Sequence, residues 1–267
     1  MRLILPESGK TFAFMYSIEN PGGDLAYGGG AVQILGPTEQ LKIRTFVDVT
    51  KFWASPGEFS LGHWGRSSPA HSPQPLPADQ FWQQIPDGYQ IYRHHHQGQI
   101  HFIDGPCRWQ FEIIPQSHWG SHHRPAQATA GWLSFLPLFD PGWQVLLAKG
   151  RAVGWMEWQG QKYEFTHAIA YAEKNWGTSF PSRWFWVQAN DFKDSPSLSV
   201  TAAAGERLVL GQREEVGLIG IHWQDRFYEF APWTGEIRWQ VSSWGLWELR
   251  ATNGNFWVTL EGKTDQA

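Results

Sequence analysis

The sequence predicts an all-β protein of antiparallel strands, arranged as barrels or as a large sandwich. Short segments rich in aromatic and β-branched residues recur along the chain, and many of them alternate in polarity. Gly and Pro residues separate these segments, whereas the periodicity of amphipathic helices is almost absent. With 267 residues, the chain is long enough for one large β domain or for two smaller lobes.

The expected strands follow one another along the chain. Strand-like sequence is already present at residues 1–5, and the chain stops just after another strand, so we expect a truncated sequence. Residues 54–87 are rich in Pro, Ser and His over much of their length, and we expect a long loop or lid there. The other strands are expected at residues 11–18, 31–35, 42–49, 89–92, 98–102, 109–115, 145–147, 151–158, 162–165 and 183–190.

The frame W-Q-x-x-x-Y-E-F occurs twice, at residues 158–165 and 223–230. In each copy, a Gln-Gly or Gln-Asp pair stands where a hairpin turn would fall. Chance similarity in an aromatic-rich chain is one explanation. The repeat favours two related β lobes with equivalent hairpins, at residues 1–150 and 151–267, of which the second is incomplete.

Tryptophan is unusually frequent, with 18 residues, while charged residues make up only 17% of the chain, below the usual ~25%. Each indole brings a large, rigid apolar face and one N–H that needs a partner when buried. For any single Trp, the β core explains its presence as well as a cavity does. Together, so many indoles favour a wide cavity or groove for an apolar, ring-bearing or cationic ligand.

Charge and cysteine content exclude several classes of protein. The net charge is −4 and the 21 Lys and Arg residues are scattered, so we expect no nucleic-acid partner. A single cysteine, Cys107, excludes a disulfide framework and a multi-cysteine zinc site. No apolar run approaches the roughly 18 residues of a membrane helix, and the N-terminus has no signal-peptide pattern. We therefore expect a soluble protein, or one attached at most to a membrane surface.

Seven histidines lie between residues 94 and 123. Neutral imidazole is a common metal ligand, and His94 and His96 would share one face of a strand. However, no carboxylate or cysteine stands at a recognisable ligand spacing, so surface or cavity-lining hydrogen bonds are the favoured role. We expect no metal site. Motifs for a serine hydrolase or for phosphate binding are also missing from the sequence.

The stretch at residues 173–186, EKNWGTSFPSRWFW, is the candidate functional centre. Glu173, Lys174 and Asn175 are consecutive, and a Gly and a Pro then turn the chain into a strand. One interpretation is an ion pair of Glu173 with Lys174 or Arg183. The other is a protonated carboxyl group in an apolar site, which can donate a proton near neutral pH. The strand that follows would present four side chains on one face, namely Trp184, Trp186, Gln188 and Asn190.

These residues resemble the tocopherol cyclase family, and the resemblance covers nearly the whole chain. Similar blocks are GGGAVQILGP at 28–37, LGHWG at 61–65, TAGWLSFLPLFDPGWQ at 129–144, GWMEWQGQKYEF at 154–165 and WTGEIRWQVSSWGLWELRATNGNFWVTLEG at 233–262. The resemblance implies lipocalin-like β-barrels in two lobes. It also implies an intramolecular lyase, or isomerase, which closes a phytyl-substituted benzoquinol to a chromanol in vitamin E synthesis and needs no cofactor.

Such a reaction requires an acid that protonates the alkene of the prenyl tail, a wall that tolerates a cation and a dry site. For the proton donor we favour Glu173, followed by Asp191 and Glu157. Lys174 or Asn175 would orient the phenol. The expected substrate-binding residues are Trp155, Glu157, Trp176, Trp184, Trp186 and Gln188.

Family members begin some tens of residues earlier, with an H-S-G-Y-H…F-E-G-W-Y-F segment, and continue beyond Ala267. The resemblance therefore also implies truncation at both ends. The lack of a transit peptide favours a cyanobacterial protein, either cytoplasmic or peripherally associated with the thylakoid membrane. Two alternatives from other classes are a non-catalytic, lipocalin-like carrier of prenylquinones or other apolar lipids, and a carbohydrate-binding β domain.

Overall fold

The protein divides into two compact units. In the computed structural model, unit 1 comprises Met1–Pro115 and Gly150–Ala170, and unit 2 comprises Gln116–Lys149 and Tyr171–Ala267. The lobes predicted from the sequence, 1–150 and 151–267, stay a prediction. The structure describes residues 1–20, 28–55, 58–64, 75–121, 128–131, 141–177, 181–209, 212–243 and 245–264.

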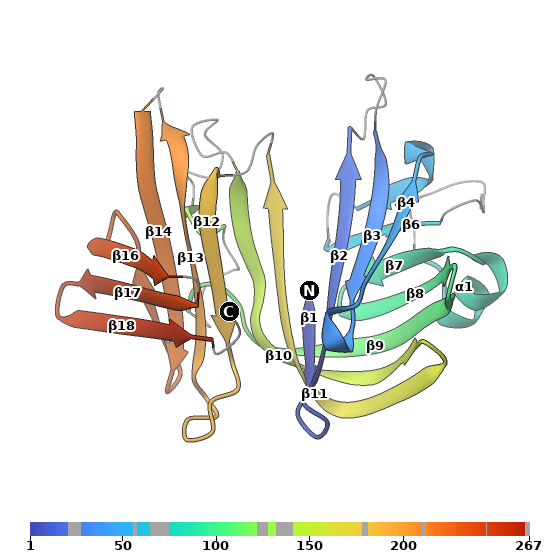
Figure 1. Cartoon of the computed structure of the whole chain (residues 1–267). Helices are drawn as coiled ribbons and strands as arrows, with labels where there is room; N and C mark the ends of the chain where they lie inside the picture. Colours follow the sequence, from blue (N-terminus) through green and yellow to red (C-terminus); the bar gives the residue numbers. More distant parts are fainter. Residues whose placement is uncertain are drawn as a thin grey trace. The chain divides into compact units, whose positions relative to one another are not determined.

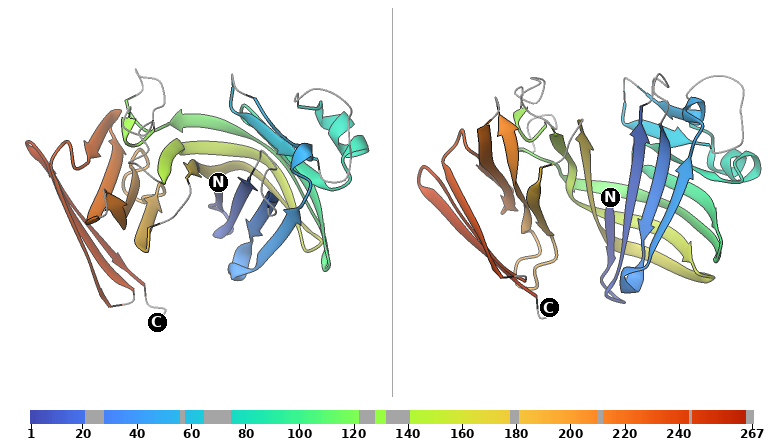
Figure 2. Two further views of the ribbon diagram at one scale, coloured as in Figure 1. Left: turned by 90° about the horizontal axis from the view of Figure 1, so that it is seen from above. Right: turned by 45° about the horizontal axis from the view of Figure 1, so that its top comes forward.

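Unit 1 is built on an antiparallel sheet of 11 strands that curls into a half-barrel (Figures 1 and 2). Strands β10 (Gly142–Trp158) and β11 (Gln161–Trp176) continue from this sheet into unit 2. The predicted all-β antiparallel class is thus confirmed. On the β11 side of this central pair, the strands are in order β1 (Arg2–Leu5), β2 (Lys10–Glu19), β3 (Gly29–Leu35) and β4 (Leu41–Phe46). On the β10 side they are β9 (Gly105–Ser117), β8 (His95–Phe102), β7 (Gly88–Tyr92), β6 (Ser60–His63) and β5 (Phe52–Ala54). Two short 3₁₀ helices, η1 (Pro37–Glu39) and η2 (Val49–Lys51), interrupt the connections.

Alternation along the strands of unit 1 produces its core. On β2, Phe12 and Phe14 are almost fully buried, while residues between them are more exposed. The ring of Phe14 lies 5.4 Å from that of Trp109 and 5.7 Å from that of Phe111 on β9, measured between centroids. Aromatic pairs at such distances contribute beyond the burial of their area.

The segment at residues 54–87 differs from the loop that the sequence predicts. It contains strand β6, which pairs with β5 and β7, and the helix α1 (Ala78–Gln84). The helix buries Phe81 and is followed by the equally buried Ile85, and both belong to a cluster with Trp53 and Trp64. Two apolar residues on one side are enough for a helix of about two turns, which is too short to produce a clear helical period. Residues 56–57 and 65–74 lie outside the described part of the chain.

Unit 2 contains two antiparallel sheets, of four and three strands. Residues from both sheets form one apolar core, with Ala202, Ile219, Phe230, Leu249 and Ala251 at its centre. The four-stranded sheet runs β12 (Arg183–Ala189), β13 (Ser199–Val209), β14 (Gln212–Trp223) and β15 (Arg226–Phe230), and the other runs β16 (Glu236–Ser243), β17 (Leu246–Asn253) and β18 (Phe256–Lys263).

Both copies of the repeated frame are hairpins, as predicted; the first lies in unit 1 and the second in unit 2. Gln159 and Gly160 turn β10 into β11 with φ angles of 52° and 76°. Gln224 and Asp225 turn β14 into β15 with φ angles of 50° and 61°. Two successive positive φ angles are the signature of a type I′ turn, whose twist suits paired strands. That the two lobes are related stays a prediction.

Six tryptophan rings lie across glycines, which accounts for part of the Trp content. Trp109, for example, stands directly opposite Gly98 on the neighbouring strand, and a Cβ atom on Gly98 would overlap the indole. The indole covers backbone that would otherwise lack side-chain packing. The same holds for Trp53 and Gly62, Trp158 and Gly36, Trp119 and Gly220, Trp176 and Gly142, and Trp247 and Gly262.

The described helices, α1, η1 and η2, are all short. Among the described residues, none of the helices has the length and apolar character to cross a membrane.

Candidate active site

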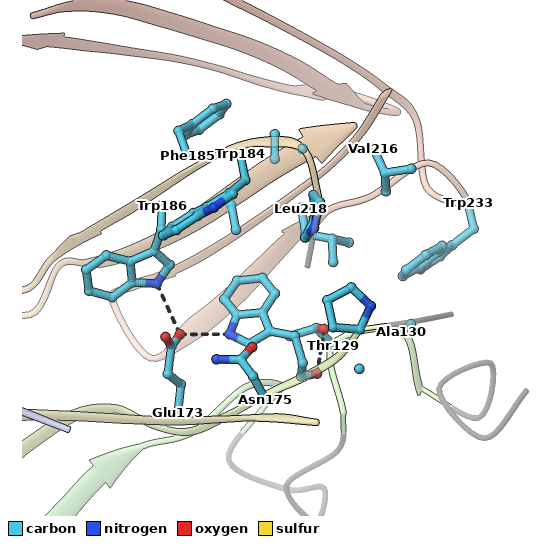
Figure 3. A pocket seen from close by; sticks show the side chains of 17 residues that line it. Thr129, Ala130, Glu173, Asn175, Trp184, Phe185, Trp186, Val216, Leu218 and Trp233 are labelled. Atoms are coloured by element: carbon cyan, nitrogen blue, oxygen red, sulfur yellow. Dashed lines mark hydrogen bonds between the residues drawn. The ribbon is translucent and has the colours of Figure 1, made fainter. Parts of the chain in front are cut away.

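A cavity of about 280 Å³ lies in unit 2, bounded by β10, β11 and the four-stranded sheet. This volume is at the lower end of small-molecule pockets, which measure roughly 300–1,000 Å³. In Figure 3, Glu173 and Asn175 point from one side toward the labelled indoles of Trp184 and Trp186. Its other lining residues are Thr129, Ala130, Pro141, Gly142, Trp143, Pro181, Phe185, Ala203, Ala204, Gly205, Val216, Leu218 and Trp233.

Strand register explains why the sheet is hollow at this point. Trp186 pairs with Ala203, which in turn pairs with Leu218, so the three side chains form one row across β12, β13 and β14. The preceding row consists of Trp184, Gly205 and Val216. Because the middle strand contributes only small residues, space remains between the indoles and the aliphatic side chains.

Three donors converge on one carboxylate oxygen at the edge of this cavity. Oε2 of Glu173 accepts hydrogen bonds from the Trp143 indole at 2.8 Å, the Tyr171 hydroxyl at 2.7 Å and the Trp186 indole at 3.1 Å. No residue in the described ranges donates a hydrogen bond to Oε1 of Glu173. One oxygen is therefore fixed by the protein, while the other remains for a ligand.

Tyr171 is suited to its role as a donor. Its burial, followed by the charge of Glu173, raises the pKa of Tyr171 well above the ordinary value. The phenol therefore keeps its proton at neutral pH and donates a hydrogen bond to Glu173. Tyr171 belongs to a buried cluster with Trp119, Val145 and Ala148, which holds its ring in place.

Among the described residues, Glu173 forms no ion pair with Lys174 or Arg183. Arg183 instead pairs with Glu206, at 2.9 Å. The Lys174 ammonium lies 5.2 Å from the centre of the Trp176 ring. Since neighbours in a strand point to opposite faces, Lys174 cannot share the environment of Glu173.

The structure brings together four of the residues predicted for the site, Glu173, Asn175, Trp184 and Trp186, all of which line the cavity. Lys174 and Trp176 are exposed, and Trp176 covers Gly142 at the rim. Gln188 shares a face with Trp186 but is buried beyond the cavity, and Asp191 is exposed after the end of β12.

Trp155 and Glu157 belong to unit 1 and do not line this cavity. The Trp155 ring stacks on that of Trp82, with 5.8 Å between centroids, and the Lys162 ammonium lies 5.5 Å from its centre. The predicted roles of Trp155 and Glu157 in substrate binding, like that of Asp191 in catalysis, stay predictions.

The sequence analysis did not identify three residues of the site: Trp143, Tyr171 and Trp233. For Tyr171 a signal existed, because it stands two residues before Glu173 in a strand and so shares its face. Trp143 and Trp233 lie far from Glu173 in the sequence, in two of the blocks that carry the family resemblance. Nothing local distinguishes them from other Trp residues.

The histidines do not form a metal centre in the described ranges, where no group of three His, Cys, Asp or Glu residues could hold an ion. Strand β8 begins at His95, so His94 lies in the preceding turn and does not share a strand face with His96. Burial lowers the pKa of His96 to about 3 and raises that of Cys107 to about 12. His122 and His123 lie outside the described residues.

Comparison with known proteins yields a consistent set of relatives. The model of the tocopherol cyclase-like family matches residues 1–267. A "Probable tocopherol cyclase, chloroplastic" of Oryza sativa subsp. japonica is 36% identical over 291 residues, covering 99% of this chain and 62% of the relative. A "Tocopherol cyclase, chloroplastic" of Zea mays is 36% identical over 292 residues, covering 100% and 61%. The chain thus spans about three fifths of the length of these curated relatives.

Among solved structures, kievitone hydratase from Nectria haematococca is similar with a TM-score of 0.49 and 10% sequence identity. The match covers 94% of this chain and 71% of the hydratase chain.

Proposed function

The chain belongs to the tocopherol cyclase-like family, and from this premise we propose that it closes the chromanol ring of a tocopherol from a phytyl-substituted benzoquinol. The observation that supports this reaction most directly is the cavity around Glu173. Ring closure is an isomerisation of the intramolecular lyase type. A proton adds to the alkene, the phenol oxygen bonds to the resulting tertiary carbon, and the phenol loses its proton. Since nothing is oxidised or reduced, the chemistry needs no cofactor in principle.

In this proposal Glu173 is the acid. Its Oε1 donates a proton to the less substituted carbon of the alkene, which leaves a carboxylate. The negative charge is then stabilised at Oε2, where the Trp143, Tyr171 and Trp186 donors are already in position. Because these donors do not have to reorganise, they favour the charge that develops during proton transfer.

The indoles of the cavity would stabilise the carbocation. Trp184 and Trp186 project from β12 into the cavity, and Trp233 lines it as well. The face of an indole attracts a desolvated cation by about 2 kcal/mol. Apolar walls also limit the entry of water, which would otherwise capture the cation.

Asn175 is the residue best placed to orient the phenol. It lines the cavity beside Glu173, whereas Lys174 lies over Trp176. Its amide can donate a hydrogen bond to the phenol oxygen or accept one from the phenol hydroxyl. After the C–O bond has formed, the phenol proton returns to the Glu173 carboxylate, so the enzyme ends each turnover unchanged.

Replacement of Glu173 tests the proposal. We expect Glu173→Gln to lower chromanol formation about 10²–10⁴-fold, because general acid catalysis contributes that much. Purified protein would be incubated with a phytyl-benzoquinol and the product measured by chromatography. Glu229→Gln is the matched control, since Glu229 also accepts an indole N–H, from Trp119 at 3.1 Å, but does not line the cavity.

Near-normal turnover by Glu173→Gln would contradict the assignment of the acid. If the unaltered chain binds the benzoquinol, as followed by quenching of Trp fluorescence, but forms no chromanol, a non-catalytic carrier of prenylquinones becomes the better account.

The proposal extends to the setting of the reaction. A phytyl tail is apolar, so we expect peripheral contact with the membrane that holds the substrate, which is the thylakoid in a cyanobacterium. The cyanobacterial origin stays a prediction, and the two curated relatives are named chloroplastic.

A further inference from the structure

Beyond the cavity, the same face of the β12–β14 sheet changes from apolar to polar. Gln188 pairs with Thr201, and this pair forms the next row after Trp186 and Ala203. Successive rows on one face are about 6.6 Å apart along a strand. Asn190 follows two residues after Gln188, so polar side chains continue away from the cavity.

Within the described ranges, these buried polar side chains lack hydrogen-bond partners. The exposed fractions are 6% for Gln188, 2% for Asn190 and 1% for Thr201. Neither the two amides nor the Thr201 hydroxyl has a hydrogen-bond partner among the residues that the structure describes. Leaving a buried polar group unpaired is destabilising, so three such groups side by side require another partner.

A ligand in the cavity is not that partner, because none of the three residues lines the cavity. Buried polar groups that lack protein partners commonly bind internal water, which makes about three hydrogen bonds. Two amides and a hydroxyl offer donors and acceptors in the mixture that water needs.

The polar group is linked to Glu173 through Tyr171. Trp186, in the row next to Gln188 and Thr201, has its ring centroid 5.5 Å from that of Tyr171. Thr201 also offsets part of the rise in the Tyr171 pKa that burial and Glu173 cause. The one hydroxyl hydrogen of Tyr171 is used in the hydrogen bond to Glu173, so the Tyr171 oxygen is left to accept a hydrogen bond.

We propose that Gln188, Asn190 and Thr201 enclose ordered internal water, which donates a hydrogen bond to the Tyr171 hydroxyl. The water thereby fixes the orientation of the Tyr171 hydroxyl, and this hydroxyl donates its hydrogen bond to Oε2 of Glu173. Tyr171, Thr201 and Gln188 are therefore positioning residues, since they act on the carboxyl group without lining the cavity.

Water relaxation dispersion of ¹⁷O, which counts long-lived internal water, tests this site without any need for activity. Thr201→Val removes the hydroxyl at nearly constant volume, and we expect it to lose at least one long-lived water relative to the unaltered chain. Thr259→Val is the matched control, because it makes the same change at an exposed position of β18. An equal water count in Thr201→Val and in the unaltered chain would overturn the proposal.

A crystal structure of the unaltered chain keeps the proposal testable if Thr201→Val does not fold. Water density within hydrogen-bond distance of Gln188, Thr201 and the Tyr171 oxygen would support the site. A dry contact between these side chains would contradict it.

The effect on catalysis rests on the proposed function. In Thr201→Val we expect kcat to fall about fivefold, the equivalent of one hydrogen bond of ~1 kcal/mol, with KM unchanged because the cavity lining is intact. A rise in KM with kcat unchanged would contradict the positioning role. If the unaltered chain forms no chromanol, the proposed function fails, while the water count still decides whether the internal water exists.

Discussion

The interior of unit 1 and the cavity of unit 2 are both built from tryptophan, but they use the indole differently. In unit 1, Trp109 is completely buried across Gly98 and contacts Phe14. In unit 2, the N–H groups of Trp143 and Trp186 point at a carboxylate beside an open cavity. The first arrangement is a packed core, and the second leaves a hollow beside a hydrogen-bonded carboxylate.

The residues opposite each indole explain this difference. Gly98 lies under the Trp109 ring and the ring fills the available space, so no room is left. Opposite Trp186 stands Ala203, and the next side chain in the row is Leu218, which leaves a hollow. The same residue type thus fills a core or borders a cavity according to the size of its neighbours.

Removal of an indole should separate the two regions most clearly. We expect Trp109→Ala to lower the free energy of unfolding by about 3–5 kcal/mol, because it opens a cavity in a packed core. Trp184, which is 61% exposed at the cavity, provides the comparison, and Trp184→Ala should cost less than about 1 kcal/mol. Urea unfolding measures both values. Equal losses would mean that the two regions do not differ in packing.

Acid should act on unit 1 through His96, whose ring is buried and stacks on that of Phe111 at 5.0 Å between centroids. Burial lowers the folded-state pKa of His96 to about 3 from 6.5, so the unfolded chain binds the proton first as pH falls. The contribution of His96 to stability is complete above pH 6.5 and declines toward pH 3.

By pH 5 this loss should reach about 2 kcal/mol, at 1.36 kcal/mol for each pH unit. Unfolding by urea at pH 7 and pH 5 measures it. In His96→Phe, which keeps an aromatic ring without a titrating group, this part of the pH dependence should disappear. An unchanged pH dependence in the variant would show that another group is responsible.

The smallest of these effects concerns the hydrogen bonds of the cavity. Trp186→Phe keeps an aromatic ring but removes one of the three donors to Glu173. We expect chromanol formation to fall about tenfold, since a hydrogen bond to a charged group contributes roughly 1.5 kcal/mol or more, with little change in stability. Trp184→Phe is the control, because Trp184 lines the same cavity and makes no hydrogen bond to Glu173. An equal loss of chromanol formation in the two variants would contradict the role of the Trp186 indole N–H.

Local features of the structure could be predicted from the sequence. Alternating polarity predicted the antiparallel strands, and the paired frame predicted hairpin turns at Gln159 and Gln224, where the observed turns lie. Alternation also placed Trp184, Trp186 and Gln188 on one face of β12, as found. Prediction failed for helix α1 within residues 54–87, because a helix of about two turns is too short to show a helical period.

The sequence by itself therefore determined the antiparallel β class, the two hairpins and the position of Glu173 among indoles, since these depend on neighbours along the chain. It did not mark strands such as β13, β16 and β17. Only the tertiary structure decided which tryptophans meet Glu173. Trp143 is 30 residues from it, and the two residues come together because their strands lie side by side. Tertiary structure also decided that Gln188 and Thr201 are buried without partners among the residues that the structure describes, because burial depends on what packs against a strand as well as on its own pattern.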